Sequence, residues 1–185
     1  MNKRIIVAVL AILLTASASA QTTNFFDLVK TGSPQAVQAA IANGADVNAR
    51  DNDGVTALMY AAESNQNPDV VATLLKAGAD ILAKDSKPHW GGTALLWAAV
   101  GNKNPKVITV LLKAGADINV RNVDGKTALI WAVMENPNPE VVMTLLNAGA
   151  DAKVKYDDYT ALDFAQMNRT LNGTSALKKL EEASK

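Results

Sequence analysis

The stretch Asp51-Asn52-Asp53-Gly54-Val55-Thr56-Ala57-Leu58 decides the fold, because marks in and around it recur along the chain. Thr-Ala-Leu occurs at 56–58, 93–95, 127–129 and 160–162, with spacings of 37, 34 and 33 residues. Gly-Ala-Asp occurs at 44–46, 78–80, 115–117 and 149–151, and Ser-Pro or Asn-Pro at 33–34, 67–68, 104–105 and 138–139. Three interleaved marks with one period predict a tandem repeat whose units stack, because one small unit cannot bury its own apolar face.

Each mark has a physical role in a pair of helices. Asn or Ser followed by Pro is typical of a helix N-cap, because proline lacks the amide that the first turn leaves unpaired. We therefore expect a helix over residues 68–77, ended at Gly78 by glycine in a left-handed conformation. Thr56 is expected to open a shorter helix whose alanines, such as Ala61, allow close packing against neighbouring helices. The polar stretch 51–54 is typical of a turn.

The unit resembles the ankyrin repeat. The match is Asp51-x-x-Gly54-x-Thr56-Ala57-Leu58-x-x-Ala61-Ala62, followed by Val70-Val71-x-x-Leu74-Leu75-x-x-Gly78-Ala79-Asp80. The resemblance implies an all-α solenoid of about five helix-loop-helix units with protruding turn or hairpin fingers. It also implies that the fingers and first helices bind other proteins. The family's Thr-Pro-Leu-His becomes Thr-Ala-Leu followed by Met59, Leu96, Ile130 or Asp163, so we expect its histidine capping hydrogen bond to be absent.

Residues 1–20 read as a signal peptide. Lys3 and Arg4 precede the apolar run 5–14, and the segment ends in Ala18-Ser19-Ala20, where we expect cleavage. The apolar run is too short for a membrane anchor. Because the exported chain has no cysteine, we favour a bacterial periplasm, with release from the cell as the alternative. Residues 21–185 form the repeat domain, with units near 23–50, 51–85, 86–121, 122–155 and 156–185.

The composition of the chain argues against catalytic, cofactor-binding and metal-binding sites. The chain has 185 residues, no cysteine, one histidine, and 18 basic against 18 acidic side chains. It lacks the usual phosphate-cradling and hydrolase motifs, so we expect no catalytic residue, no cofactor and no metal. Balanced charge gives no reason to expect nucleic acid. We expect a monomer that binds another protein. The alternatives are a dedicated inhibitor or immunity protein for one secreted enzyme, such as a cell-wall hydrolase, and an enzyme without a recognisable motif.

The repeats differ from one another in one finger. We number the fingers by unit, each from its glycine to its threonine: the second spans 44–56, the third 78–93, the fourth 115–127 and the fifth 149–160. The third is three residues longer than the second and fourth, which places His89 and an exposed Trp90 at its tip. Trp90 is predicted to anchor a partner, because tryptophan is enriched at binding hot spots. The alternative is that Trp90 folds back on the neighbouring finger.

An aromatic side chain also recurs four residues after each threonine, at Tyr60, Trp97, Trp131 and Phe164. Stacking should place these rings side by side. Packing between repeats is the favoured interpretation, and a binding strip on the concave face is the alternative. Further candidates for partner binding follow from their position in the fingers alone: Arg50, Asn52, Asp53, Arg121, Val123, Asp124, Tyr156 and Tyr159.

Overall fold

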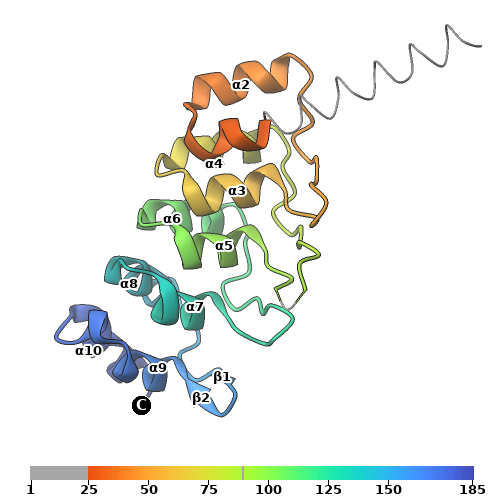
Figure 1. Cartoon of the computed structure of the whole chain (residues 1–185). Helices are drawn as coiled ribbons and strands as arrows, with labels where there is room; N and C mark the ends of the chain where they lie inside the picture. The colour runs from red at the N-terminus through yellow and green to blue at the C-terminus, as the bar shows by residue number, and fades with distance from the viewer. Residues whose placement is uncertain (1–24, 89) are drawn as a thin grey trace, which may run out of the picture.

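The computed structural model describes residues 25–88 and 90–185, which form a single file of helix pairs stacked in chain order (Figure 1). The expected signal peptide and His89 lie outside the described residues. Residues 25–31 are helical. The elements that follow are α2 (Pro34–Ala42), α3 (Ala57–Ser64), α4 (Pro68–Lys76), α5 (Ala94–Gly101), α6 (Pro105–Lys113), α7 (Ala128–Glu135), α8 (Pro139–Asn147), β1 (Lys155–Tyr156), β2 (Tyr159–Thr160), α9 (Ala161–Met167), the short 3-10 helix η1 (Arg169–Leu171) and α10 (Ser175–Ala183).

The helices form two layers, with the fingers projecting from one side. The first helices α3, α5, α7 and α9 contact one another in order, and so do the second helices α2, α4, α6, α8 and α10. In Figure 1 the loops that carry the fingers project to the right, past the first helices. This arrangement confirms the predicted helical solenoid. Within the described residues, no helix is both long and apolar enough to cross a bilayer.

The predicted start and stop signals are confirmed in the second helices. Asn67, Asn104 and Asn138 each accept a hydrogen bond from the amide two residues later, and proline follows each of them. The Gly78 and Gly115 backbones have φ of 91° and 97°, in the left-handed region that favours glycine. These local rules therefore fix where the second helices begin and end.

Two of the side chains that replace the family's histidine, Met59 and Asp163, accept hydrogen bonds from the helix N-cap. The backbone N–H of Thr56 donates to Met59 Sδ at 3.4 Å, and that of Thr160 donates to Asp163 Oδ2 at 2.7 Å. Hydrogen bonds from Thr160 hold the pKa of Asp163 below its usual range. The sequence predicts only that the bond made by the family's histidine is absent, and in these two units Met59 and Asp163 accept a capping hydrogen bond at that position instead.

A row of asparagines at the end of the first helices joins each unit to the one before it. Asn102 Nδ2 donates to the carbonyl oxygens of Ala62 at 2.8 Å and Asn65 at 2.9 Å. Asn136 repeats the pattern on Ala99 and Asn102, and Asn65 and Asn168 reach back to their own preceding units. We call Asn65, Asn102, Asn136 and Asn168 the asparagine ladder. It supplies buried polar contacts that hold the register of the stack.

The fingers are turns with little strand character. β1 and β2 pair antiparallel in the fifth finger, with Tyr156 opposite Tyr159. Single antiparallel bridges join Arg50 to Thr56 and Arg121 to Thr127 in the second and fourth fingers. The predicted turn or hairpin fingers are thus present, and they place their side chains next to the first helices.

Candidate functional site

The aromatic side chains of successive units form a continuous row along the first helices. Ring centroids lie 5.5 Å apart for Phe26 and Tyr60, and 6.2 Å apart for Tyr60 and Trp97. Trp97 and Trp131 are bridged by Trp90, whose ring centroid is 5.9 Å from the first and 4.6 Å from the second. We call Phe26, Tyr60, Trp97, Trp90 and Trp131 the aromatic row. Trp97 is buried, while Tyr60, Trp90 and Trp131 are half-buried.

The prediction that Trp90 is exposed at the tip of the third finger is wrong. Its ring lies between Trp97 and Trp131, and a Cβ at Gly92 would collide with its indole nitrogen. The backbone is held to the next finger, since the Val123 N–H donates to the Trp90 carbonyl at 3.2 Å. The inserted residues therefore fill the space between two repeats. A role for Trp90 in partner binding stays a prediction.

Phe164 does not continue the aromatic row among the pairs described. Its ring lies 6.2 Å from Tyr156 and 5.8 Å from Tyr159, so it packs within its own unit. The Tyr159 side chain is largely exposed, and the Tyr156 side chain is half-buried. The fifth finger thus carries a separate aromatic cluster.

Lysine ammonium groups lie over the aromatic rings. Lys30 Nζ is 4.3 Å from the centroid of Tyr60, and Lys87 Nζ is 4.5 Å from that of Trp97. Lys126 Nζ lies 4.5 Å from the Trp131 centroid and 4.0 Å from that of Tyr156, and so joins the fourth and fifth fingers. Such contacts stabilise by ~0.5–2 kcal/mol each. The sequence does not reveal these contacts, because lysine has no shared position relative to the repeat marks.

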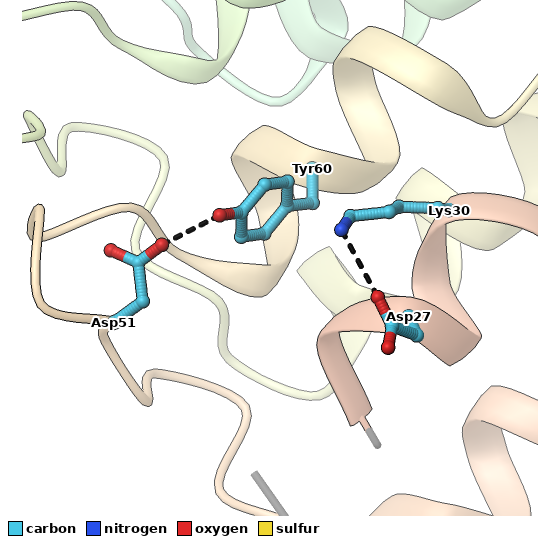
Figure 2. Close-up of polar contacts among 4 residues, drawn as sticks. All are labelled: Asp27, Lys30, Asp51 and Tyr60. Atoms are coloured by element: carbon cyan, nitrogen blue, oxygen red, sulfur yellow. Dashed lines mark hydrogen bonds and ion pairs between the residues drawn. The ribbon is translucent and has the colours of Figure 1, made fainter. Parts of the chain in front are cut away.

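In the second and third fingers an aspartate accepts a hydrogen bond from the aromatic row. Tyr60 Oη donates to Asp51 Oδ2 at 2.6 Å, and Trp97 Nε1 donates to Asp85 Oδ2 at 2.8 Å. Figure 2 shows the Tyr60 side chain extending from α3 toward Asp51, with Lys30 and its ion-pair partner Asp27 on the other side. Burial, reinforced by the bond to Asp51, raises the pKa of Tyr60.

The fourth finger has asparagine where the other two have aspartate. Asn122 is 6 % exposed, and its Oδ1 accepts a hydrogen bond from the Lys126 backbone N–H at 2.8 Å. Asn122 Nδ2 and Trp131 Nε1 are both buried and have no hydrogen-bond partner among the described residues, and the same holds for Trp90 Nε1. Comparing Asp51, Asp85 and Asn122 in the sequence would have revealed this difference.

The remaining finger candidates lie mostly in solvent. Arg50 is exposed, yet its guanidinium donates to the carbonyl oxygens of Gly54 at 3.1 Å and Lys84 at 2.8 Å and so braces two fingers. The Val123 side chain is 66 % exposed. Other exposed candidates are Asn52, Asp53, Arg121 and Asp124, the last of which pairs with Lys126 at 3.7 Å. These side chains lie on the exposed surface of the second and fourth fingers, and their binding role stays a prediction.

Acidic groups on this face are scattered rather than clustered. No three His, Cys, Asp or Glu side chains of the described residues come together as metal ligands would. Glu63 on α3 is half-buried, and burial raises its pKa while Lys87 and Lys30 oppose the rise. The face is therefore built from aromatic rings, lysines and turn backbone.

Stacked helix pairs, glycine-ended second helices and fingers at a fixed period define a helical repeat scaffold. A family model described as ankyrin repeats (3 copies) matches residues 10–85 and 95–182. The chain belongs to the ankyrin-repeat family. This family is generally a non-catalytic binding scaffold, which favours protein partners. A comparison with curated proteins found no match.

Proposed function

We propose that this chain is an exported, non-catalytic module that binds another protein and holds, protects or regulates it. The observation that carries the proposal is the aromatic row, which crosses four units on the face that bears the fingers. Aromatic and arginine side chains are enriched at the cores of protein interfaces. This face offers half-buried rings bordered by exposed polar side chains, which matches the pattern of a core and a rim.

Export is supported by the N-terminal sequence and by the cysteine-free composition. Expression of the full chain in a Gram-negative host, followed by osmotic release of the periplasm, tests this part. We expect the released protein to begin at Gln21 by mass spectrometry. Retention of the intact chain in the cytoplasm would contradict export.

Binding is tested by capturing partners from periplasmic extract with two matched variants. The first replaces Asp53, Val123 and Tyr159 by serine, one exposed side chain in each of three fingers. The second replaces Lys76 and Lys113 by serine at the exposed ends of α4 and α6 in the other layer of helices. We expect the wild type and the second variant to retain the same protein, and the first variant to lose it.

Equal capture by both variants would place the interface elsewhere, and no specific capture by any of them would count against the proposal. If the captured protein is a secreted enzyme such as a cell-wall hydrolase, its turnover with and without the chain tests the inhibitor alternative. A partner whose activity is unchanged but whose aggregation slows fits a holding or protecting role.

A further inference from the structure

We infer that the fourth finger contains a carboxylate-binding site built by Asn122, Trp131 and Lys126, which takes a carboxylate group from the partner. The inference rests on the proposed function for the source of that carboxylate, but its chemistry comes from the repeats themselves. In the second and third units an aspartate oxygen accepts from the aromatic side chain of the following helix, at 2.6 Å and 2.8 Å. The fourth unit keeps the donor and has lost the acceptor.

The loss follows from the chemistry of the amide. Asp51 uses one oxygen for the finger backbone and the other for the ring donor. Asp85 Oδ1 accepts the Lys87 backbone N–H, while its Oδ2 accepts both the Gly92 backbone N–H at 3.0 Å and the ring donor of Trp97. Asn122 has one oxygen, which accepts the Lys126 backbone N–H at 2.8 Å and does not accept the Trp131 indole N–H. Turning the amide over would only exchange one unpaired donor for another, because its NH2 group would then face the Lys126 N–H.

Two buried donors of the fourth unit therefore remain without an acceptor among residues 25–88 and 90–185. They are Asn122 Nδ2, on a side chain 94 % buried, and Trp131 Nε1. A buried donor without a partner destabilises the fold, because it has lost its hydrogen bonds to water. A ligand that supplies an acceptor here would remove that penalty, and its binding free energy would gain accordingly. Asp51 and Asp85 occupy the equivalent place in their units, and a carboxylate oxygen is therefore the acceptor that this geometry fits.

Charge at the site also favours an anion. The Lys126 ammonium lies 4.5 Å from the Trp131 ring centroid, and its one acidic contact in the described structure is Asp124 at 3.7 Å. N–H donors and an ammonium group together match a carboxylate better than a neutral carbonyl. A neutral group from a partner, such as an amide or an aromatic ring, would not supply the Lys126 ammonium with an opposite charge.

Trp90 covers the site from the third finger. Its ring packs on Trp131 at 4.6 Å, and a loop holds it by hydrogen bonds from the Trp90 N–H to Lys87 O at 3.1 Å and from Val123 N–H to Trp90 O at 3.2 Å. Gly91 and Gly92 follow directly. Access for a carboxylate therefore requires this ring to move, and the backbone contacts that such a movement would break belong to the loops rather than to the helices.

The test is a titration of the purified, 15N-labelled protein with sodium acetate, followed by the indole N–H signals in 1H–15N NMR spectra. The chain has three tryptophans, and Trp97 serves as an internal reference because Asp85 already accepts its N–H. We expect the Trp131 signal to move downfield by several tenths of a ppm and the Trp97 signal to stay fixed. Sodium chloride at the same ionic strength should move neither.

Three variants decide the outcome. Asn122→Asp supplies the acceptor internally and should abolish the acetate shift, while Asn52→Asp adds the same charge to the exposed second finger and should leave it intact. Trp131→Phe removes the donor but keeps a ring, and identifies the signal. No shift of Trp131 in the wild type, or an equal shift in Asn122→Asp, would overturn the inference.

Peptides distinguish the source of the carboxylate. One is amidated at its C-terminus and carries a single glutamate, and the other lacks acidic side chains but ends in a free carboxylate. A shift with only one of them names the group that a partner presents. If acetate binds but periplasmic capture fails, the proposed function falls and the site stands. Capture that is unchanged by Asn122→Asp, together with no acetate shift, removes the site and leaves the proposed function.

Discussion

Asn122 differs from an aspartate by one polar atom, and that atom decides whether a buried indole N–H finds an acceptor. Asn122→Asp should place a carboxylate oxygen beside Trp131 Nε1 and near the Lys126 ammonium. Because one net buried hydrogen bond contributes ~1 kcal/mol, and more when one partner is charged, we expect the free energy of unfolding to rise by about 1–3 kcal/mol. Urea unfolding followed by circular dichroism measures the change.

The exposed Asn52 provides the control for the added charge. Asn52→Asp should leave the free energy of unfolding within about 0.5 kcal/mol of wild type. If both substitutions change it equally, the gain at Asn122 is not due to the missing acceptor.

Glu63 makes the stability of the fold depend on pH. Burial raises its pKa above the ordinary value of 4.5, with Lys87 and Lys30 opposing. A carboxyl whose pKa is higher in the folded state stabilises the fold fully below its ordinary pKa, and this contribution is lost as the pH rises through the raised value. Glu63→Gln stays neutral and should therefore raise the Tm relative to wild type at pH 7.

The difference between the two Tm values should shrink toward zero near pH 4, where both side chains are neutral. Thermal unfolding between pH 4 and pH 8 measures it. A difference that is constant across this range would show that ionisation of Glu63 has no part in it.

The asparagine ladder stabilises the C-terminal ends of the first helices. Asn102 is fully buried, donates two hydrogen bonds to the preceding unit and accepts one from the Asn104 N–H. Asn102→Ala leaves these backbone groups buried and unpaired, and we expect a loss of about 3 kcal/mol in the free energy of unfolding. Asn172→Ala, at an exposed position outside the ladder, is the matched control in the same denaturation experiment. Equal losses would contradict a structural role for the ladder.

The ends of the second helices depend on backbone conformation. Gly115 has φ of 97°, and a Cβ there would meet no atom within 4 Å, so a side chain is opposed by the backbone alone. Gly115→Val should lower the free energy of unfolding by ~1–2 kcal/mol, because a β-branched residue resists this conformation. Gly115→Asn should cost less, since asparagine tolerates it better. Chemical denaturation ranks the wild type and the two variants, and equal free energies of unfolding for wild type and Gly115→Val would refute a left-handed helix end at Gly115.

Helix boundaries were predictable because their signals are local. Asn67-Pro68 and Gly78 specify a start and a stop from the chemistry of neighbouring residues in the chain. The asparagine ladder was missed although Asn65, Asn102 and Asn136 recur in the sequence. Its acceptors are carbonyl groups of the preceding unit, and only the stacked structure shows that they are within reach.

At the scale of the whole molecule, stability comes from the interfaces between units. Leu95 on α5 is 1 % exposed and belongs to an interior unit that packs on both sides. Leu95→Ala should cost ~2–5 kcal/mol, because it creates a cavity that the flanking helices cannot fill completely. Urea denaturation by circular dichroism measures the loss. A loss under 1 kcal/mol would mean that the array does not depend on this interface.

The candidate site was less predictable than the fold, for a reason that Trp90 illustrates. Its place in a loop insertion predicts exposure, but the insertion turns inward and the ring fills the gap between Trp97 and Trp131. The aromatic positions themselves follow from the repeat period. How deeply each ring is buried, and which lysine covers it, depends on pairs of units and therefore on packing that no single repeat encodes.

The asparagine ladder also has a consequence for how such an array changes during evolution. Each ladder residue carries its own donor and finds its acceptors in the unit before it, whose helix ends with the same backbone carbonyls. A unit duplicated within the gene would therefore arrive with its own connection to its neighbour, and a deleted unit would remove its connection with it. The length of the row of fingers can grow or shrink by whole units, while the inserted Trp90 loop marks one unit as distinct from its copies.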